Sequence, residues 1–142
     1  MDEDFNYDKY VDFYYSNLIN SLVLLSLSAR ELEKLASPSF DPIDELYEEA
    51  QYAFTPVCFE TIFRTNKVDT SFKDSLLKIK IELDAIPSEI WNYENMDNHE
   101  AWISTRKNAN ALLGKLGISH RKYTTDFITV YDKNGKGIDN LF

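Results

Sequence analysis

The sequence predicts a mainly α-helical protein, a compact multi-helix bundle with a small β-hairpin at its C-terminus. Apolar residues recur at spacings of three and four along most of the chain, which is the period of a helix with one buried face. Only four glycines and four prolines interrupt the 142 residues, which favours long helices over a loop-rich fold. This length is typical of one domain, so we expect a single domain over 1–142, helical over about 1–124.

The first helix is predicted over about residues 5–27. Its apolar stripe is widened by further apolar residues, so we expect a central helix with neighbours on several sides; the stripe comprises Tyr7, Val11, Tyr14, Leu18, Leu22 and Leu25. Ser28 and Glu31 have the spacing of a capping box, which predicts a bend and a short second helix to about Ala36. The alternative is one long unbroken helix.

The next helix is predicted to begin at Asp41-Pro42, an N-cap followed by proline in the first turn. Its buried face is expected to hold Ile43, Leu46, Tyr47, Ala50, Ala53 and Phe54. The opposite face is expected to hold Asp44, Glu45, Glu48 and Glu49. Pro56 then interrupts or restarts the helix, and another buried turn or two follows with Val57, Phe59, Ile62 and Phe63.

The second half is predicted to contain two longer helices. One covers about 71–86 and ends before Pro87, and residues 92–98 are polar and read as a loop. The last helix is expected to run from a cap at Asn98 to about Leu116, with Gly117 as its C-terminal cap. Residues 125–131 are rich in β-branched and aromatic side chains and precede a turn signal, which predicts a hairpin over 125–142.

The familiar metal-binding and catalytic patterns fail at named positions. Residues 132–138 resemble the start of an EF-hand loop, but Lys136 stands where a ligand oxygen is required. His99-Glu100 begins like a zinc-protease helix, but Ile103 replaces the second histidine, so His99 is expected to face solvent near a helix start. Cys58 lies between apolar neighbours and is expected in the core. We therefore expect no catalytic residue, no metal and no cofactor.

The net charge of −9 is distributed unevenly. Residues 1–71 contain fourteen acidic and five basic residues, whereas residues 72–142 contain ten of each. An acidic surface repels nucleic acid and anionic lipid and attracts a basic partner, although acidity also serves solubility alone. The most apolar run, 18–27, is shorter than the roughly 20 residues of a membrane span. We expect a cytoplasmic protein that binds neither nucleic acid nor membrane.

The acidic helix after Asp41 is the candidate partner-binding surface. Asp44 repels Glu48, and Glu45 repels Glu49, because residues four apart are neighbours on a helix. A face that costs stability in this way is explained by a partner, or more simply by solvation of the charges. Tyrosines beside the charges add contact area, so the predicted contact residues are Asp41, Asp44, Glu45, Tyr47, Glu48, Glu49 and Tyr52.

A second set of residues lies at helical spacing in the last third of the chain. Glu89-Ile90-Trp91 is followed by Trp102, and then by Arg106, Asn110, Leu112 and Leu113. This pattern resembles that of small bacterial immunity proteins, which are encoded beside polymorphic or contact-dependent toxins. The resemblance implies a non-enzymatic protein that neutralises a cognate toxin by occluding its basic surface or active site.

Two other classes of function stay open at the level of sequence. The first alternative is a structural or adaptor module that binds another protein, or a second copy of itself, through its aromatic residues. The second is a hydrolase that uses two carboxylates, because acidic residues are abundant and their spacing selects no pair. An acidic helical scaffold suits the immunity function best, because toxins that cleave nucleic acid are commonly basic and are attracted to it.

Overall fold

The structure, a computed structural model, describes residues 7–123 together with 130–131 and 137–138. These residues form a mainly helical bundle, which confirms the predicted fold class at that level. The helices follow one another as η2 (Tyr7–Tyr10), α1 (Val11–Ser26), α2 (Ala29–Leu35), α3 (Pro42–Ala53), α4 (Pro56–Arg64), η3 (Thr70–Phe72), α5 (Lys73–Asp84), η4 (Ser88–Ile90), α6 (Tyr93–Asn98) and α7 (Glu100–Lys115).

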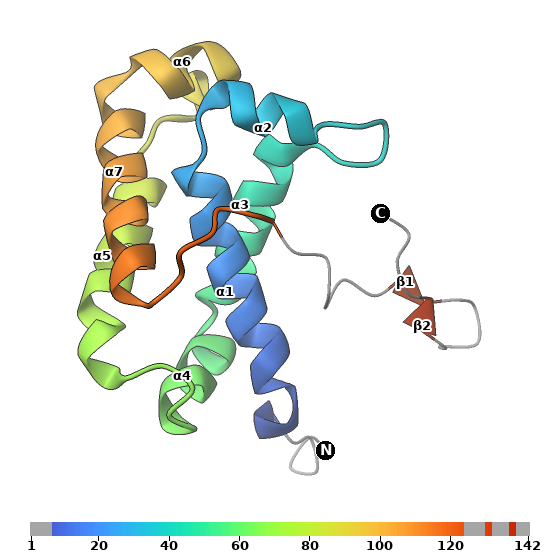
Figure 1. Cartoon of the computed structure of the whole chain (residues 1–142), viewed down its shortest axis with the longest axis vertical. Helices are drawn as coiled ribbons and strands as arrows, with labels where there is room; N and C mark the ends of the chain where they lie inside the picture. The colour runs from blue at the N-terminus through green and yellow to red at the C-terminus, as the bar shows by residue number, and fades with distance from the viewer. Residues whose placement is uncertain (1–6, 124–129, 132–136, 139–142) are drawn as a thin grey trace.

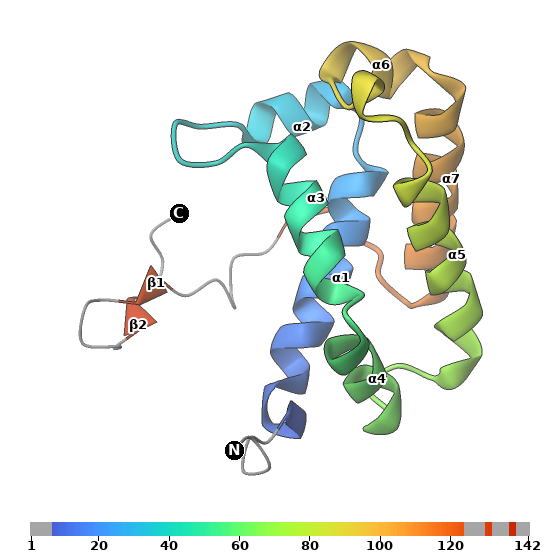
Figure 2. The same cartoon turned by 180° about the vertical axis from the view of Figure 1, so that it is seen from behind.

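Helix α1 occupies the centre of the bundle, as its wide apolar surface predicted. It packs against α3 and α4 on one side and against α7 on the other, and α5 lies beside α7 (Figures 1 and 2). Leu18, Leu22, Val23 and Leu24 are fully inaccessible to solvent. A helix buried on nearly all sides must also satisfy its polar side chains internally. Ser21 and Ser26 do so by donating to the carbonyls of Leu18 and Val23.

The predicted break after α1 is confirmed, and the alternative of one unbroken helix is wrong. Ser28 Oγ accepts from the Glu31 amide at 3.1 Å, and the Glu31 carboxylate accepts from the Ser28 amide at 2.9 Å. This reciprocal capping box starts α2 in a new direction. Asp41 likewise caps α3, because its Oδ1 accepts from the Ile43 amide at 3.0 Å and Pro42 occupies the first turn.

Residues 92–98 are mostly helical, and the prediction of a loop there is wrong. Asn92 caps α6 by accepting from the Asn95 amide at 2.9 Å, and the short helix buries Met96. The cap of α7 is His99 rather than Asn98, because His99 Nδ1 accepts from the Ala101 amide at 3.1 Å. An imidazole cap is not among the usual capping residues, so the sequence favoured the neighbouring asparagine.

The C-terminal end of α7 was predicted correctly. Gly117 has a φ of 84°, which an L side chain rarely adopts, and its amide donates to the Gly114 carbonyl at 3.0 Å. The Ile118 amide donates to the Leu113 carbonyl at 2.9 Å, completing a Schellman motif. The chain then turns back from α7 and crosses α1 towards α3 (Figure 1).

Most of the predicted hairpin over 125–142 lies outside the described residues. Within the described part, β1 (Val130–Tyr131) pairs in antiparallel fashion with β2 (Gly137–Ile138). The hairpin as a whole stays a prediction. Among the helices that the structure describes, none has the length and apolar character needed to cross a bilayer.

Replacing Leu22 by alanine is expected to lower the free energy of unfolding by about 2–5 kcal/mol, because a cavity would remain at the centre of the bundle. Ile81 on α5 is 68% exposed and provides the control, since Ile81→Ala should change stability by less than about 0.5 kcal/mol. Urea denaturation followed by circular dichroism measures both. Equal losses in the two variants would contradict the central position of α1.

Candidate functional site

Most of the predicted contact residues lie on helix α3, and Asp44 and Glu48 are exposed as expected. Tyr47 lies between them and is 54% exposed, so its predicted place on the buried face is wrong. Positions 44, 47, 48 and 51 share one face of a helix, because residues three and four apart lie above one another. Asp41 is also exposed, but its carboxylate is engaged in capping α3.

Glu49 is buried, and its predicted place on the solvent face is wrong. Its side chain is 7% exposed, and the Tyr123 hydroxyl donates to its Oε2. Position 49 falls three residues after Leu46 and four before Ala53, both of which are core residues. The same spacing therefore places Glu49 on the core-facing side of α3, where a partner has no access.

The neighbouring carboxyl groups of buried Glu49 and half-buried Glu45 form an acidic pair. Burial raises the pKa of Glu49 to about 8, and the hydrogen bond from Tyr123 only partly opposes this shift. The nearby charge of Glu45 raises the pKa of Glu49 further. Burial also raises the pKa of the half-buried Glu45. Near neutral pH, Glu49 is thus held mainly as the uncharged acid, which lets two carboxyl groups share one site.

Tyr52 lies on a different side of α3 from Tyr47. Its ring meets those of Phe13 and Tyr14 edge-on, with centroids 6.0 and 6.4 Å away. Burial and the neighbouring Cys58 raise the pKa of its hydroxyl to about 12. Tyr52 is still 42% exposed, but it belongs to the seam between α3, α1 and α4. The seven predicted residues therefore do not form one continuous face.

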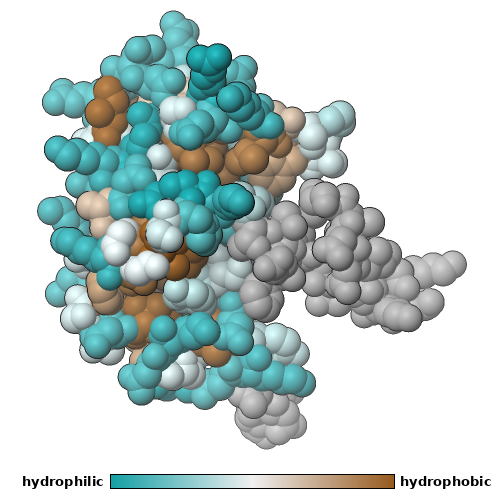
Figure 3. Space-filling view, viewed as in Figure 1, coloured by the Kyte–Doolittle hydropathy of each residue, from teal (hydrophilic) through white to brown (hydrophobic). Residues whose placement is uncertain are grey.

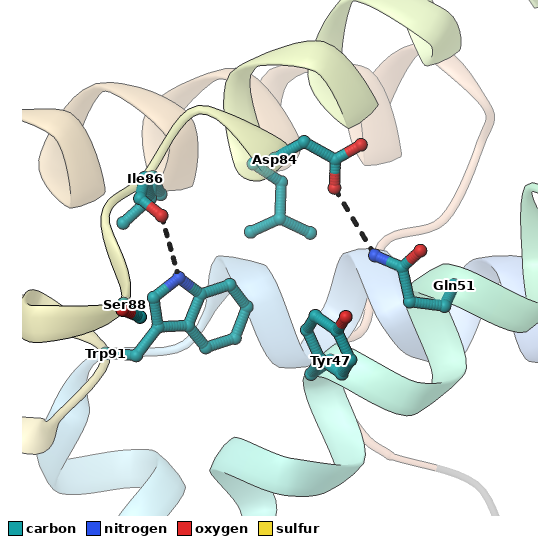
Figure 4. A pocket seen from close by; sticks show the side chains of 7 residues that line it. Tyr47, Gln51, Asp84, Ile86, Ser88 and Trp91 are labelled. Atoms are coloured by element: carbon teal, nitrogen blue, oxygen red, sulfur yellow. Dashed lines mark hydrogen bonds between the residues drawn. The ribbon is translucent and has the colours of Figure 1, made fainter.

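A groove adjoins the exposed side of α3, and sequence reasoning did not find it. It is an open pocket of about 430 Å³ between α3 and the segment that joins α5 to η4 (Figure 4). Its lining residues are Tyr47, Gln51, Leu83, Asp84, Ile86, Ser88 and Trp91. We call it the α3–α5 groove. The lining combines two aromatic rings, two aliphatic side chains and three polar ones, drawn from segments separated by more than thirty residues in the sequence.

Trp91 is held in a fixed position at one end of this groove. Its Nε1 donates to the Ile86 carbonyl at 3.2 Å, and its ring packs edge-on against Trp102, with centroids 4.9 Å apart. Trp102 is in turn anchored, because its Nε1 donates to the Ile90 carbonyl at 2.7 Å. Tyr47 also packs edge-on against Trp91, with centroids 5.8 Å apart and planes at 80°. The aromatic lining is therefore preorganised.

The opposite end of the groove is polar. Gln51 Nε2 donates to Asp84 Oδ1 at 3.3 Å, which links α3 to α5 across the opening (Figure 4). Asp84 Oδ2 also pairs with Lys80, which lies one turn earlier on α5. By contrast, no ion pair with Asp44 or Glu48 is formed within the described part of the chain. The uncompensated negative charge of this region therefore lies on the α3 side.

The polar residues of the second pattern, in the last third of the chain, have structural partners. Arg106 Nε donates to the Leu27 carbonyl at 3.1 Å and also bonds the carbonyl of Met96. Asn110 Nδ2 donates to the Ser26 carbonyl at 3.1 Å. Arg121 Nε donates to Asn110 Oδ1 at 2.7 Å. Arg106 and Asn110 thus bind backbone carbonyls at the end of α1 and in α6, so packing within the bundle also explains their helical spacing.

No group of three or more potential metal ligands occurs among the described residues. His99 is exposed and caps α7, and Cys58 is buried in α4, as the sequence predicted for both. The segment that resembles an EF-hand start lies mostly outside the described residues. Among the residues that line the α3–α5 groove, Asp84 is the one carboxylate, whereas a glycosidase-like site needs two that converge.

Comparison of the chain with protein-family models, with curated proteins and with solved structures found no significant match.

Glu49→Gln is expected to flatten the pH dependence of stability. The pKa of Glu49 is about 8 in the folded chain and near 4.5 in an unfolded one, so the folded state holds the extra proton between these values. The free energy of unfolding therefore falls as pH rises through this window, by on the order of 1 kcal/mol per pH unit. Glutamine mimics the protonated acid and removes this loss.

The test is urea denaturation at several values between pH 4.5 and pH 8, the window that the Glu49 shift defines. Glu48→Gln is the matched control, because Glu48 is the adjacent residue but is exposed. A slope for Glu49→Gln equal to that of the unaltered chain would show that Glu49 titrates normally.

Proposed function

We propose that this chain is a non-enzymatic binding protein that neutralises a basic partner, a cognate bacterial toxin domain, in the manner of an immunity protein. One observation carries the proposal. Asp44 and Glu48 are exposed, have no ion-pair partner within the described residues, and flank the 54% exposed Tyr47 at the edge of a preorganised aromatic groove. The proposed place of action is the cytoplasm.

The composition of this surface supports a protein partner with positive charge. Exposed carboxylates steer a basic surface into contact and accelerate association, whereas exposed tyrosine adds contact energy once the surfaces meet. Helices α3 and α5 lie at the front in Figure 2, and Figure 3 shows the opposite face, where hydrophobic side chains form separate patches within a mainly hydrophilic surface.

The proposed mechanism is occlusion. The protein needs no chemistry of its own, because a rigid helix laid against a catalytic cleft excludes its substrate. Phosphate-binding clefts are lined with lysine and arginine, and the acidic side of α3 competes with nucleic acid for these side chains. The contact residues are Asp44, Tyr47 and Glu48, with Glu45 at the margin. The buried Glu49 supports α3 from beneath.

The double variant Asp44→Asn/Glu48→Gln is expected to weaken binding of the partner roughly tenfold, mainly by slowing association, and to reduce the dependence of affinity on salt. The partner to use is the product of the gene adjacent to that of this chain. Affinity and association rate are measured by surface plasmon resonance at two salt concentrations, and rescue of growth from the toxin is scored in parallel.

The matched control is Asp74→Asn/Glu100→Gln, which removes two exposed first-turn carboxylates from α5 and α7 and changes net charge equally. If both double variants weakened partner binding equally, total charge would explain the effect, and α3 would not be the contact surface. If this chain fully rescued growth from a toxin that it does not bind, the proposed neutralisation by direct binding would be contradicted.

A second candidate, a self-associating adaptor, is favoured by a different surface. Leu77 and Ile81 lie one turn apart on α5 and are 38% and 68% exposed. Neighbouring apolar side chains of this kind are typical of protein contacts.

If the adaptor function holds, the chain sediments as an oligomer and Ile81→Lys shifts it to a monomer, because a charge in an apolar contact is costly. Analytical ultracentrifugation measures this, and Ile103→Lys on α7, also exposed at 44%, is the control. A monomeric unaltered chain at high concentration would rule out self-association through α5.

A further inference from the structure

We propose that the α3–α5 groove binds an arginine side chain of the basic partner, an inference that rests on the proposed function. The groove would then be the anchor point of the interface, with the acidic side of α3 around it. A volume of about 430 Å³ falls in the range of pockets that hold small ligands, so it accommodates one long side chain and part of its backbone.

The aromatic lining suits a planar cation. Tyr47 and Trp91 both line the groove, and their ring planes meet at 80°, so the lining includes two aromatic rings whose faces point in different directions. A guanidinium group stacks on such faces and is attracted by their quadrupoles. Trp91 is fixed by its hydrogen bond to the Ile86 carbonyl and by its contact with Trp102, so little ordering of the lining is needed on binding.

The remaining lining matches the two ends of an arginine side chain. Leu83 and Ile86 are buried aliphatic residues, and the methylene stem of arginine packs on such surface. Asp84, Gln51 and Ser88 supply oxygen acceptors. Asp84 already accepts from Gln51 and Lys80, but a carboxylate has about four lone-pair sites, which leaves capacity for a guanidinium donor.

The surrounding charge favours a cation over a neutral or anionic side chain. Lys80 is compensated by Asp84, whereas Asp44 and Glu48 on the α3 side lack ion-pair partners among the described residues. The chain as a whole carries a net charge of −9. Arginine is preferred to lysine because it stacks on the rings and donates through a planar fork. An uncharged aliphatic side chain is the competing occupant.

The experiment titrates the ¹⁵N-labelled full chain with N-acetyl-L-arginine amide and, separately, with N-acetyl-L-norleucine amide, which has a similar stem but no charge. We expect arginine to shift the Trp91 indole N–H and the Gln51 side-chain amide, with a dissociation constant on the order of millimolar. Norleucine should shift them less at equal concentration. Absent shifts, shifts confined to other surfaces, or equal shifts with norleucine would overturn the inference.

Tyr47→Ala tests the aromatic wall, and Tyr52→Ala is the matched control, because both tyrosines are exposed on α3 but only Tyr47 lines the groove. Tyr47→Ala should weaken arginine binding roughly threefold, and Tyr52→Ala should leave it unchanged. Equal effects of the two variants would also overturn the inference.

The two proposals fail in different ways. If the Asp44→Asn/Glu48→Gln variant weakens partner binding as expected but free arginine shifts nothing, the groove inference fails and the proposed function stands. If arginine occupies the groove but no basic partner binds the chain, the proposed function fails, and the groove is still a site that binds arginine.

Discussion

The bundle depends on satisfying the C-terminal end of a buried helix. Helix α1 is covered on nearly all sides, and the last carbonyls of any helix lack partners within it. Asn110 and Arg106 of α7 supply donors to Ser26 and Leu27 at this point, across more than seventy residues of sequence. An unpaired buried carbonyl costs free energy comparable to a lost hydrogen bond. This requirement fixes α7 against α1.

Once α7 is fixed, the rest of the groove follows from it. Trp102 on α7 packs on Trp91 and bonds the Ile90 carbonyl, which positions η4 beside the end of α5. Trp91 then provides the surface on which Tyr47 of α3 rests. Hydrogen bonds at the C-terminal end of α1 thus help to determine the shape of a pocket at the surface, through two tryptophans in direct contact.

The acidic residues of helix α3 lie on two different sides of the helix, one packed against the bundle and one exposed to solvent. Glu49 and Glu45 lie towards α1 and Tyr123, where burial keeps one of them uncharged. Asp44 and Glu48 are exposed to solvent, where a partner can reach them. The cost of repulsion within α3 is therefore lower than four ionised carboxylates would impose, because protonation relieves one of the pairs.

The sequence alone is enough to predict the helical class, the central first helix, the caps at Ser28 and Asp41 and the end at Gly117, because these follow from local spacing and capping chemistry. The burial of Glu49 could also have been predicted from the sequence, because Glu49 is three residues after Leu46 and four before Ala53, the spacing of the buried face. Tertiary structure alone decided the α3–α5 groove and the partners of Arg106 and Asn110. These depend on contacts between distant segments, which local periodicity does not encode.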